Sequence, residues 1–577
     1  MEHALNRALE LLKEYNVTFN TNVNNFLQSD KTYIENQTLY YESIPRALLY
    51  LKSLEYNKHI TFLNNFETFG TMIDLSRGAV FSVSYLKEII MKNAMLGANQ
   101  VWLYLEDVYD LDVPYFGYLR GKYSKAELQE VVEFAQTLGV EIIPSIQTLG
   151  HMEQLLKWPE NYEYSDQEDV LLPESEKTKE LVTKMIQFCK EVFKTNKIHI
   201  GMDETFGLGF GRYYKLKGFK KPEDIFIDHL MMVYEIAKSF GYKDIMIWSD
   251  MFFRLYSPTN YYYDYNSIID QRLIDKIPHD VTLVYWDYYN HNYDVVSKMI
   301  KKHLSLNRKM FMASGTWVWT RFTYDKSQTD RTALEHVKAC IEHGVKDIIF
   351  TQWQDDGAYV DFDTVLLGVF EMSKAVVSPD IPNGVYEYLR NESYEVALTR
   401  NKVNDLEIRL EGLIWDDLLL GIYINNYVGY DIHKLEKHIQ IYKRLLKEFS
   451  ANELNHTKLL LKTGLLKLEI RKDLLKKYKK DYDFKTTYNK INKFKRSIQE
   501  LIESFNGLWR KRNKIYGLEI IQSRLATQLV RADELKYQLT MLESNHEYKL
   551  DFLEEKIGNP QYLSLKYQGL ATSTKPR

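Results

Sequence analysis

Two adjacent carboxylates, Asp203 and Glu204, stand in the stretch HIGMDETFGLGFGRYY, between an apolar run and a glycine-rich segment. Consecutive Cα atoms are about 3.8 Å apart, and neighbouring side chains on a strand point to opposite faces. Both acids can therefore face one site only if the strand ends between them.

This adjacency suits a particular division of labour between the two acids. One carboxylate can protonate a leaving oxygen while the other steadies a substrate group that acts as the nucleophile. A carboxylate beside a developing cation lowers the barrier, and a neighbouring acid is expected to raise its partner's pKa toward the range of a general acid. The conventional retaining plan differs, because it holds an acid and a nucleophile about 5–5.5 Å apart, usually on different strands.

Eight short apolar runs, which alternate with amphipathic helical patterns, predict the elements that position these acids. Parallel strands that are apolar throughout and separated by helices are typical of an α/β fold with a (β/α)8 TIM barrel. The runs cover residues 71–77, 100–107, 141–147, 197–204, 244–251, 281–289, 309–317 and 347–356.

Polar or tryptophan side chains follow every one of the eight runs. Barrel enzymes build their active sites from the carboxyl ends of the strands, so these side chains are predicted to converge on one mouth. They are Asp74 and Arg77, Glu106 and Asp107, Gln147 and His151, Asp203 and Glu204, Trp248 and Asp250, Trp286 with Asp287 and Tyr288, Trp317 and Trp319, and Trp353 with Asp355 and Asp356.

The pattern divides the chain into three predicted parts. Residues 1–65 mix helix with strand and are expected to form a small α+β domain, and residues 66–375 hold the catalytic barrel. Residues 376–577 show continuous helical periodicity with mixed charges, which predicts an α-helical C-terminal domain. Its basic helix faces leave open a homo-oligomer contact through this domain.

Composition excludes several classes of function. A formal charge of -4 over 577 residues provides no basic field for nucleic acid. No apolar run is long enough to span a membrane, and no secretory signal is visible, so a cytoplasmic location is expected. The two cysteines lie far apart, so neither disulfides nor a cysteine-ligated metal is indicated. Aromatic residues make up 14% of the chain, and their faces suit sugar rings.

The motif HIGMDE resembles the signature of glycoside hydrolase family 20, the β-N-acetylhexosaminidases, in the branch with a helical C-terminal domain. PSIQTLGH, WSDMFFRL, LVYWDYY and TQWQDDG extend the likeness in the same order. The resemblance implies exo-acting hydrolysis of terminal β-linked GlcNAc or GalNAc without a cofactor or metal. The acetamido oxygen of the substrate would attack the anomeric carbon to form an oxazolinium ion, with Glu204 as the general acid/base and Asp203 as the residue that orients and stabilises the acetamido group.

The resemblance also implies roles for residues around the acids. A box of indoles would enclose the acetamido methyl, Asp355 would bind distal hydroxyls, and His151 would be held in one tautomer by Glu106 or Asp107. Tyr288 is the chosen donor to the acetamido carbonyl, with Tyr289 and the Trp317/Trp319 pair as competitors. The indoles are Trp248, Trp286 and Trp353, with Trp319 as a further substrate-binding candidate.

One position departs from the family pattern. Many members place an arginine before the first barrel strand to bind ring hydroxyls, whereas FETFGTMIDLSR offers Phe69 there. Asp74 and Arg77 are the available replacements, and Arg77 could equally serve as a structural ion-pair partner.

Three other functions compete with this interpretation. A metal-dependent hydrolase would need a histidine cluster on the first strand, and TMIDLSRG has none. An idle sugar-binding barrel would keep the tryptophans and lose the acid. A conventional retaining β-glycosidase would pair Glu204 with a distant nucleophile such as Asp355, and it would cleave substrates that lack the acetamido group.

Overall fold

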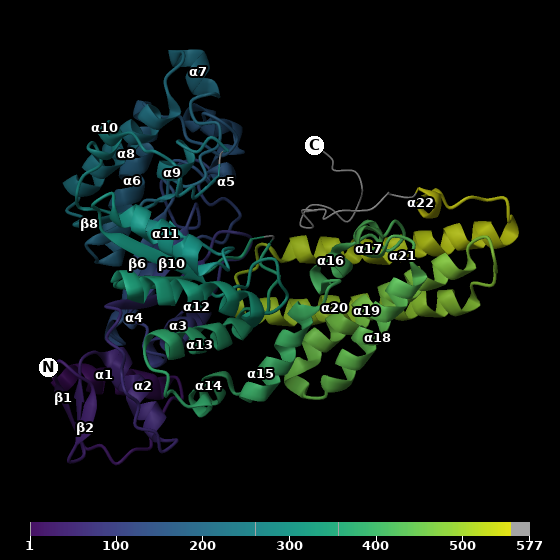
Figure 1. Ribbon diagram of the computed structural model, residues 1–577, viewed down its shortest axis with the longest axis horizontal. Coiled ribbons are helices and arrows are strands. Elements are labelled where there is room, and N and C mark those ends of the chain that lie inside the picture. Colours follow the sequence, from purple (N-terminus) through teal and green to yellow (C-terminus); the bar gives the residue numbers. More distant parts are fainter. Residues whose placement is uncertain (1, 260, 356, 556–577) are drawn as a thin grey trace.

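The computed structural model describes residues 2–259, 261–355 and 357–555, so the predicted strand-end residue Asp356 lies outside the described residues (Figure 1). A β/α barrel and a long helical region lie side by side, and a small sheet with two helices packs at the edge of the barrel (Figure 1). Among the helices of the described residues, none is long and apolar enough to cross a membrane.

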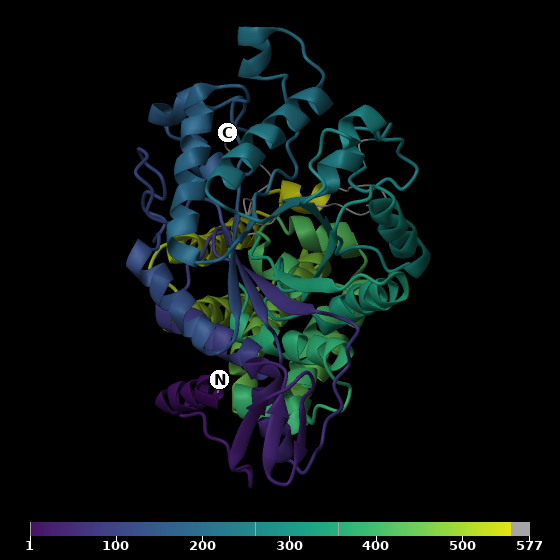
Figure 2. The same ribbon diagram turned by 90° about the vertical axis from the view of Figure 1, so that its left-hand side faces the viewer.

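Eight parallel strands close into a barrel in the order β10-β11-β4-β5-β6-β7-β8-β9, which confirms the predicted fold. Figure 2 looks along this barrel, with the C-terminal helices behind it. The strands are β4 (Thr68–Asp74), β5 (Gln100–Leu105), β6 (Glu141–Ile146), β7 (Lys197–His199), β8 (Asp244–Trp248), β9 (Val281–Trp286), β10 (Met310–Gly315) and β11 (Asp347–Gln352).

Two strand boundaries differ from the expected ones. β4 begins at Thr68 rather than at residue 71, so Phe69 lies inside the strand, buried against Phe350 at 6.1 Å between ring centroids. β7 ends at His199 instead of reaching residue 204. The acid pair therefore lies in the loop after the strand, not on it.

Helices surround the barrel, and side-chain caps fix where several of them begin. Ser124 accepts a hydrogen bond from the backbone of Glu127, whose carboxylate accepts one from the backbone of Ser124, so α4 starts with a reciprocal capping box. The helices from the first to the last barrel strand are α3 (Val83–Met95), α4 (Lys125–Thr137), α5 (Glu153–Leu156), α6 (Glu176–Phe193), α7 (Arg212–Lys217), α8 (Pro222–Ser239), α9 (Asp250–Arg254), α10 (Gln271–Ile274), α11 (Tyr293–Leu304) and α12 (Lys326–His343), with the 3-10 helix Pro159–Tyr164.

The N-terminal part holds a three-stranded sheet in the order β1-β3-β2 between two helices. β2 and β3 pair antiparallel, and β1 pairs with β3 in parallel. The elements are α1 (Glu2–Glu14), β1 (Asn25–Gln28), β2 (Tyr33–Glu35), β3 (Thr38–Tyr41) and α2 (Ile44–Leu54).

After the barrel the described chain is helical. One hydrophobic core joins the N-terminal part, the barrel and the chain up to Ala397. A second core combines residues between Val403 and Leu553 with Ala79, Phe322, Ala358 and Tyr359 from loops of the barrel. The predicted domain boundaries stay predictions. The helices are α13 (Leu366–Val376), α14 (Asn383–Arg390), α15 (Tyr394–Asn401), α16 (Leu410–Trp415), α17 (Ile422–Val428), α18 (Ile432–Glu448), α19 (Asn455–Lys477), α20 (Lys485–Arg512), α21 (Leu518–Ser544) and α22 (Asp551–Glu554), with 3-10 helices Phe362–Val365, Lys402–Asp405 and Asn452–Leu454.

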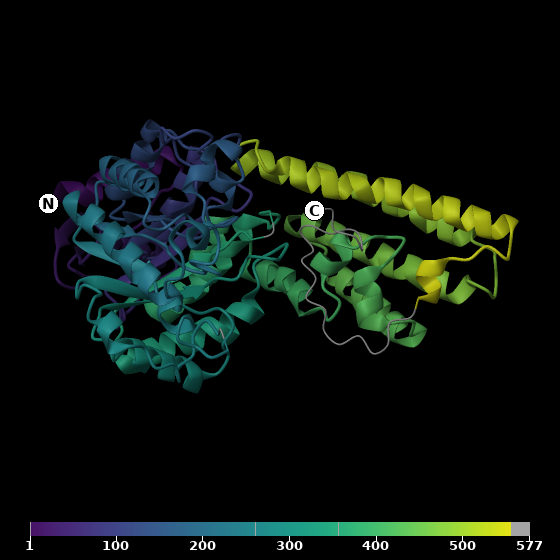
Figure 3. The same cartoon turned by 90° about the horizontal axis from the view of Figure 1, so that it is seen from above.

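The turn between α20 and α21 docks on the barrel (Figures 1 and 3). The backbone of Lys514 donates to the carbonyl of Val80 at 2.8 Å, and that of Ser82 donates to the carbonyl of Arg512 at 2.7 Å. The buried Arg512 guanidinium pairs with Asp361 and, at 2.9 Å, with Asp363. These contacts fasten the C-terminal helices to the loops that follow β4 and β11.

A glycine contact completes this docking. Gly517 has a φ of +94°, and a Cβ at this position would lie 1.8 Å from the carbonyl oxygen of Gly78. Gly78 in turn lies against the backbone of Gly357. Three segments that are distant in sequence therefore meet backbone to backbone beside the barrel mouth.

Candidate active site

A pocket with an empty volume of about 440 Å³ lies at the carboxyl ends of the barrel strands. Nine of the side chains predicted to converge on the mouth line it, and Tyr289, a predicted competitor, joins them. The lining residues are Arg77, Asp203, Glu204, Trp248, Trp286, Tyr288, Tyr289, Trp319, Trp353 and Asp355.

A left-handed backbone brings the two acids to the same pocket. Gly201, Met202 and Glu204 have φ values of +71°, +72° and +51°. A Cβ on Gly201 would lie 2.1 Å from Oε1 of Gln147, so the close approach requires glycine there. Non-glycine residues in this region cost about 1–3 kcal/mol each and gather at functional sites. The winding of the chain after β7 is what lets neighbouring acids face one mouth.

His151 bridges the two acids. Its Nε2 atom lies 3.1 Å from Oδ2 of Asp203 and 3.4 Å from Oε2 of Glu204. Burial lowers the pKa of His151, but Asp203 and Glu204 outweigh burial and raise it well above the usual range. The ring is therefore a cation at neutral pH, held between two carboxylates.

The charge of His151 reverses one expectation about the acids. Burial raises the pKa of Glu204, but the hydrogen bond and charge of His151 bring it below the usual value. The expected rise caused by Asp203 is present but smaller. The pKa of Asp203 is also lowered, because His151 and Gln147 outweigh its burial. The prediction that Asp203 would bring Glu204 into a general acid's range is therefore wrong, because His151 outweighs Asp203.

Asp203 is fixed on its other side by an amide. Gln147 donates from Nε2 to Oδ1 of Asp203 at 2.8 Å, and its Nε2 lies 3.0 Å from the hydroxyl of Tyr104. All three side chains are buried. Both oxygens of Asp203 are thereby held in one orientation beside the pocket.

Asp250 lies behind Glu204. Its Oδ2 accepts a hydrogen bond from the backbone of Glu204 at 3.1 Å, and its Oδ1 accepts one from Nε1 of Trp286 at 3.4 Å. Burial and the charge of Asp203 raise the pKa of Asp250 to about 8. Asp250 therefore fixes the turn from Gly201 to Glu204, which we call the acid turn, without adding a full negative charge at neutral pH.

Aromatic rings form most of the pocket wall. Trp286 stacks on Tyr288 with ring centroids 5.5 Å apart, and Trp319 meets Tyr288 edge to face at 5.1 Å. Trp248 and Trp353 lie 6.2 Å apart on the other side. The Tyr288 hydroxyl and Nε1 of Trp248 are buried and lack a well-formed hydrogen bond within the described part of the chain. The wall is thus built largely from aromatic rings.

The competitors of Tyr288 differ in where they lie. Tyr289 is 61% exposed at the rim and meets Trp317 edge to face at 5.6 Å. Trp317 stacks behind Trp319 at 4.0 Å and does not line the pocket. Of the two tyrosines, Tyr288 is the buried one, and burial raises its pKa, which keeps the hydroxyl protonated.

An ion pair closes the opposite side of the pocket. Arg77 donates from NH1 to Oδ1 of Asp355 at 2.9 Å, and its guanidinium lies 4.7 Å from the ring centroid of Trp353. Arg77 and Asp355 thus present a fixed pair of donor and acceptor groups at the rim. Both residues were predicted to bind ring hydroxyls, and they lie where such a contact is available.

Four of the predicted site residues do not line this pocket: His151, which bridges the acids behind it, and three that hold the surrounding loops. Asp74 is fully buried and accepts hydrogen bonds from the backbones of Ser76, Arg77 and Gln354, so it shapes the loop after β4. Asp107 pairs with Arg120 at 3.2 Å. Glu106 accepts from the Tyr104 hydroxyl at 3.1 Å and lies 3.6 Å from Arg77.

The predicted support of His151 also differs. Its hydrogen-bonding contacts go to Asp203 and Glu204, and none to Glu106 or Asp107 is found among the described residues. Glu106 instead faces the Arg77 side of the mouth, where burial raises its pKa to about 7. Its influence on His151 is the attraction of a nearby charge rather than a bond to the ring.

Four further side chains hold the site, and the sequence assigned them no role. Gln147 and Asp250 were recognised only as strand-end residues, and Tyr104 lies inside β5. Tyr262, in the loop after β8, gives Glu204 a hydrogen bond that lowers its pKa. The strand-end signal could have found Gln147 and Asp250, whereas no local pattern marks Tyr262.

His151, Asp203 and Glu204 also form the one group in the described chain whose ligand atoms could surround a metal, all within 4.8 Å of one another. A metal ligand must be a neutral imidazole, whereas the neighbouring acids raise the pKa of His151 well above the usual range. The group therefore fits a shared proton better than a metal ion.

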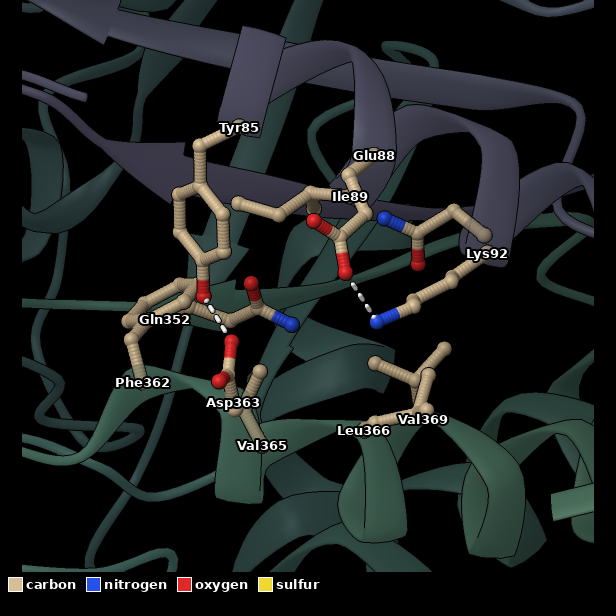
Figure 4. Close-up of a pocket in the computed structure, with 11 residues that line it drawn as sticks. Tyr85, Glu88, Ile89, Lys92, Gln352, Phe362, Asp363, Val365, Leu366 and Val369 are labelled. Carbon is tan, nitrogen blue, oxygen red and sulfur yellow. Dashed lines mark hydrogen bonds and ion pairs between the residues drawn. The ribbon is translucent and has the colours of Figure 1, made fainter. Parts of the chain in front are cut away.

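A separate hollow of about 350 Å³ lies between α3 and α13, outside the barrel (Figure 4). The Tyr85 hydroxyl points to Asp363 at 2.5 Å, and Lys92 pairs with Glu88 at 2.6 Å (Figure 4). Its lining is largely apolar and, within the described residues, includes none of the acids of the mouth.

Two family models match the chain. The model "Glycosyl hydrolase family 20, catalytic domain" matches residues 66–338, and "Glycoside Hydrolase 20C C-terminal domain" matches residues 409–560. The chain belongs to glycosyl hydrolase family 20. It is therefore a glycoside hydrolase, and the acid pair with its indole-lined pocket lies within the segment that matches the family's catalytic domain.

Curated relatives of this family 20 chain include Hexosaminidase D from Bos taurus, 26% identical over 302 residues, or 50% of this chain and 79% of the relative. Hexosaminidase D from Homo sapiens is 30% identical over 224 residues, or 37% of this chain and 43% of the relative. Among solved structures, the GH20 exo-β-N-acetylglucosaminidase from Vibrio harveyi has a TM-score of 0.49 at 12% identity, covering 68% of this chain and 72% of its own.

Proposed function

We propose that this family 20 hydrolase removes terminal β-linked GlcNAc or GalNAc from glycans or glycoconjugates, with retention of configuration and with the substrate's own acetamido group as nucleophile. The observation that carries the proposal is the acid turn, which aims Asp203 and Glu204 into one pocket closed by indole rings. A pocket of about 440 Å³ suits a single sugar ring and favours attack at chain ends.

The first step forms a ring within the substrate. The acetamido carbonyl oxygen attacks the anomeric carbon, the bond to the leaving oxygen breaks, and Glu204 gives its proton to that oxygen. Asp203 takes up a position beside the acetamido nitrogen, where its negative charge stabilises the positive oxazolinium. Because Gln147 and His151 already hold Asp203, little reorganisation is needed when that charge develops.

The second step releases the sugar. Glu204, now ionised, takes a proton from a water molecule, whose oxygen attacks the anomeric carbon and reopens the oxazolinium. Two inversions at one carbon leave the β configuration unchanged. A single carboxyl thus serves as acid and then as base.

Glu204 must carry a proton to act as the acid, although its pKa is lowered. His151, a cation at 3.4 Å from Glu204, is the nearest proton source. A sugar that excludes water from the mouth disfavours the charged pair, so the proton moves toward Glu204 as the pocket fills. His151 is thereby a proton store for the acid.

The remaining lining groups suit the rest of an N-acetylhexosamine. The buried Tyr288 hydroxyl is placed to donate to the acetamido carbonyl, and Trp248, Trp286 and Trp353 surround space for its methyl group. The Arg77–Asp355 pair offers a cation and a carboxylate to the ring hydroxyls at the rim.

A conventional retaining glycosidase is the second candidate. It would use Asp355 as the nucleophile, but Asp355 is engaged by Arg77 at 2.9 Å, which stabilises the carboxylate and reduces its reactivity. Asp203, the other lining acid, is adjacent to Glu204 rather than across the pocket from it. The acid turn therefore favours the substrate-assisted route.

A panel of nitrophenyl β-glycosides tests the proposal directly. We expect release from N-acetylglucosaminide and N-acetylgalactosaminide, none from glucoside or galactoside, and the same rates with a chelator present. Cleavage of the glucoside would support the conventional mechanism instead. Release of only internal fragments from a long polymer would refute attack at chain ends.

Two further expectations accompany this function. A cytoplasmic location and a homo-oligomer formed through the helical C-terminal region stay predictions. Fractionation of the native host and light scattering of the purified chain test them.

A further inference from the structure

A larger hollow, with an empty volume of about 1260 Å³, opens beside the one-sugar pocket. The two share Arg77, Glu204 and Asp355. In the proposed function Glu204 gives its proton to the leaving group. The leaving group therefore lies where the pocket and the larger hollow meet, beside Glu204. The described lining residues are Ser76, Arg77, Gly78, Glu106, Arg120, His151, Glu153, Gln154, Asp169, Glu204, Asp355, Gly357, Ile520 and Arg524.

Two of these lining residues come from the C-terminal helices rather than from the barrel. Ile520 and Arg524 are one turn apart on α21 and therefore lie on one face of that helix. Ile520 approaches the Gly357 position, with Cγ2 3.8 Å from where a Cβ would lie. The guanidinium carbon of Arg524 lies 5.6 Å from the centroid of the Trp415 ring, a contact that helps to position the charged group.

The first turn of α21 is held firmly at this place. The hydrogen bonds of Arg512 and Lys514 and the contact of Gly517 with Gly78 fix the turn that precedes it. Figure 3 shows α21 running from the barrel to the far end of the helical region. Ile520 and Arg524 thus form a wall of defined position, not a mobile flap.

We propose that this hollow is the subsite for the leaving group, that its ligand is a neutral sugar, and that Ile520 and Arg524 of the C-terminal region help to select it. The inference rests on the proposed function, because it takes Glu204 as the acid. It assigns to the helical region a part in substrate choice.

The lining chemistry points to a neutral polyhydroxylated ligand. Both donors and acceptors line the hollow, which suits hydroxyl groups, while Ile520 gives one apolar contact. Arg77 and Arg120 are compensated by Asp355 and Asp107. Arg524 and His151 are cations of the same lining, but the carboxylates of Glu106, Glu153, Asp169 and Glu204 outnumber them, so no surplus positive charge attracts a leaving sugar with a carboxylate or sulfate.

The test compares two substrates that differ only in the leaving group. β-N-acetylglucosaminyl fluoride has a leaving group of one atom and does not reach the hollow, whereas a β-linked N-acetylglucosaminyl-hexose disaccharide fills it. Variants Arg524→Ala and Ile520→Ala are measured on both. Val530→Ala, on the same helix and 68% exposed, is the matched control.

We expect Arg524→Ala to lower kcat/KM for the disaccharide about tenfold, as for loss of a hydrogen bond to a charged donor, and to leave the fluoride rate within about twofold. Ile520→Ala should show a smaller loss of the same kind, and Val530→Ala none. A fluoride rate equal to that of the parent also shows that the variants are folded.

The outcomes separate the two proposals. If the parent hydrolyses neither substrate, the proposed function is wrong. If it hydrolyses both and the variants lower the two rates equally, or lower neither, the subsite is wrong. A parent that prefers a disaccharide with a uronic acid leaving group over the neutral one would overturn the choice of ligand.

Discussion

Nε2 of His151 lies 3.1 Å from Oδ2 of Asp203, on a backbone with a φ of +55° at the histidine. A cation in this position stabilises a carboxylate and at the same time holds a proton close to the acid. The protonation of the whole site therefore depends on His151.

Replacing His151 by Asn should narrow the pH profile of kcat/KM from both sides. Asn tolerates the left-handed backbone and carries no charge. The cation lowers the pKa of Asp203, so its loss should move the acid limb, where Asp203 ionises, to higher pH. The basic limb, where the proton shared by His151 and Glu204 is lost, should move to lower pH, because the raised pKa of His151 no longer retains that proton. A profile that superimposes on that of the parent would contradict the role of His151.

Replacing Glu204 by Gln should affect substrates according to their leaving groups. Loss of general acid catalysis typically costs about 10²–10⁴-fold. A disaccharide, with a poor leaving group, should lose most of its rate, while a nitrophenyl glycoside should lose less because it needs less protonation. Steady-state rates on the two substrates provide the comparison, and equal losses would argue against Glu204 as the acid.

Replacing Asp203 by Asn should be costly whatever the leaving group. The acid stays in place, but the charge that faces the oxazolinium is gone. A cyclised thiazoline analogue of the intermediate should inhibit the parent and bind the variant much more weakly, as measured by calorimetry. Equal binding to both forms, or a sugar trapped covalently on a carboxylate, would establish the conventional mechanism.

Replacing Asp250 by Asn should flatten the dependence of stability on pH. Burial and Asp203 raise the pKa of Asp250 to about 8 in the folded protein, against about 3.9 for an unfolded chain. Between these two pKa values the folded state holds a proton that the unfolded state has lost, so the free energy of unfolding falls as pH rises. The contribution of this proton is complete below about pH 4 and is lost as pH rises through about 8.

The Asn side chain has no such proton to lose. The Tm of the Asp250→Asn variant should therefore fall less between about pH 6 and about pH 9 than that of the parent. The exposed Asp228→Asn change serves as a control and should follow the parent's slope. If Tm fell equally with pH in the Asp250→Asn variant and in the parent, Asp250 would not be the source of the pH dependence.

Replacing Gly517 by Ala should loosen the C-terminal helices from the barrel, because a Cβ there would collide with the backbone of Gly78. Since Arg77 is the residue before Gly78, a shift of this loop should displace Arg77 and lower activity on every substrate. The matched change Gly507→Ala, inside α20 with open space around it, should raise the free energy of unfolding by about 0.5–1 kcal/mol and leave activity intact. Thermal melts and fluoride hydrolysis measure both. A Gly517→Ala protein with the stability and activity of the parent would show that the contact between Gly517 and Gly78 does not hold the C-terminal helices on the barrel.

Much of the site followed from the sequence because a parallel barrel brings all strand ends to one face. Trp248, Trp286 and Trp353 could be placed in the pocket for this reason alone. The local winding of the acid turn could not, since the left-handed values at Met202 and Glu204 depend on contacts with the strands around them. The pKa of Glu204 was misjudged because His151, distant in sequence, lies between the acids.

The same limit explains the residues that changed roles. Asp107 looks like a strand-end ligand until Arg120, from the following loop, reaches it. The helical periodicity around Ile520 predicted a helix and its amphipathic character, but not that its first turn would stand at the mouth of the barrel. Pairings across hundreds of residues leave no local trace in the sequence.

The glycine contact at the barrel mouth has a consequence for how the enzyme is made. Gly78, Gly357 and Gly517 meet only when more than 500 residues have left the ribosome, since the last of them is residue 517. Domains generally fold in order of synthesis, so the barrel can close long before its mouth is completed. A nascent or prematurely terminated chain would therefore carry every catalytic residue and still lack the wall that aligns Arg77 and bounds the leaving group. Catalytic competence thus reports that translation has passed the hairpin between α20 and α21.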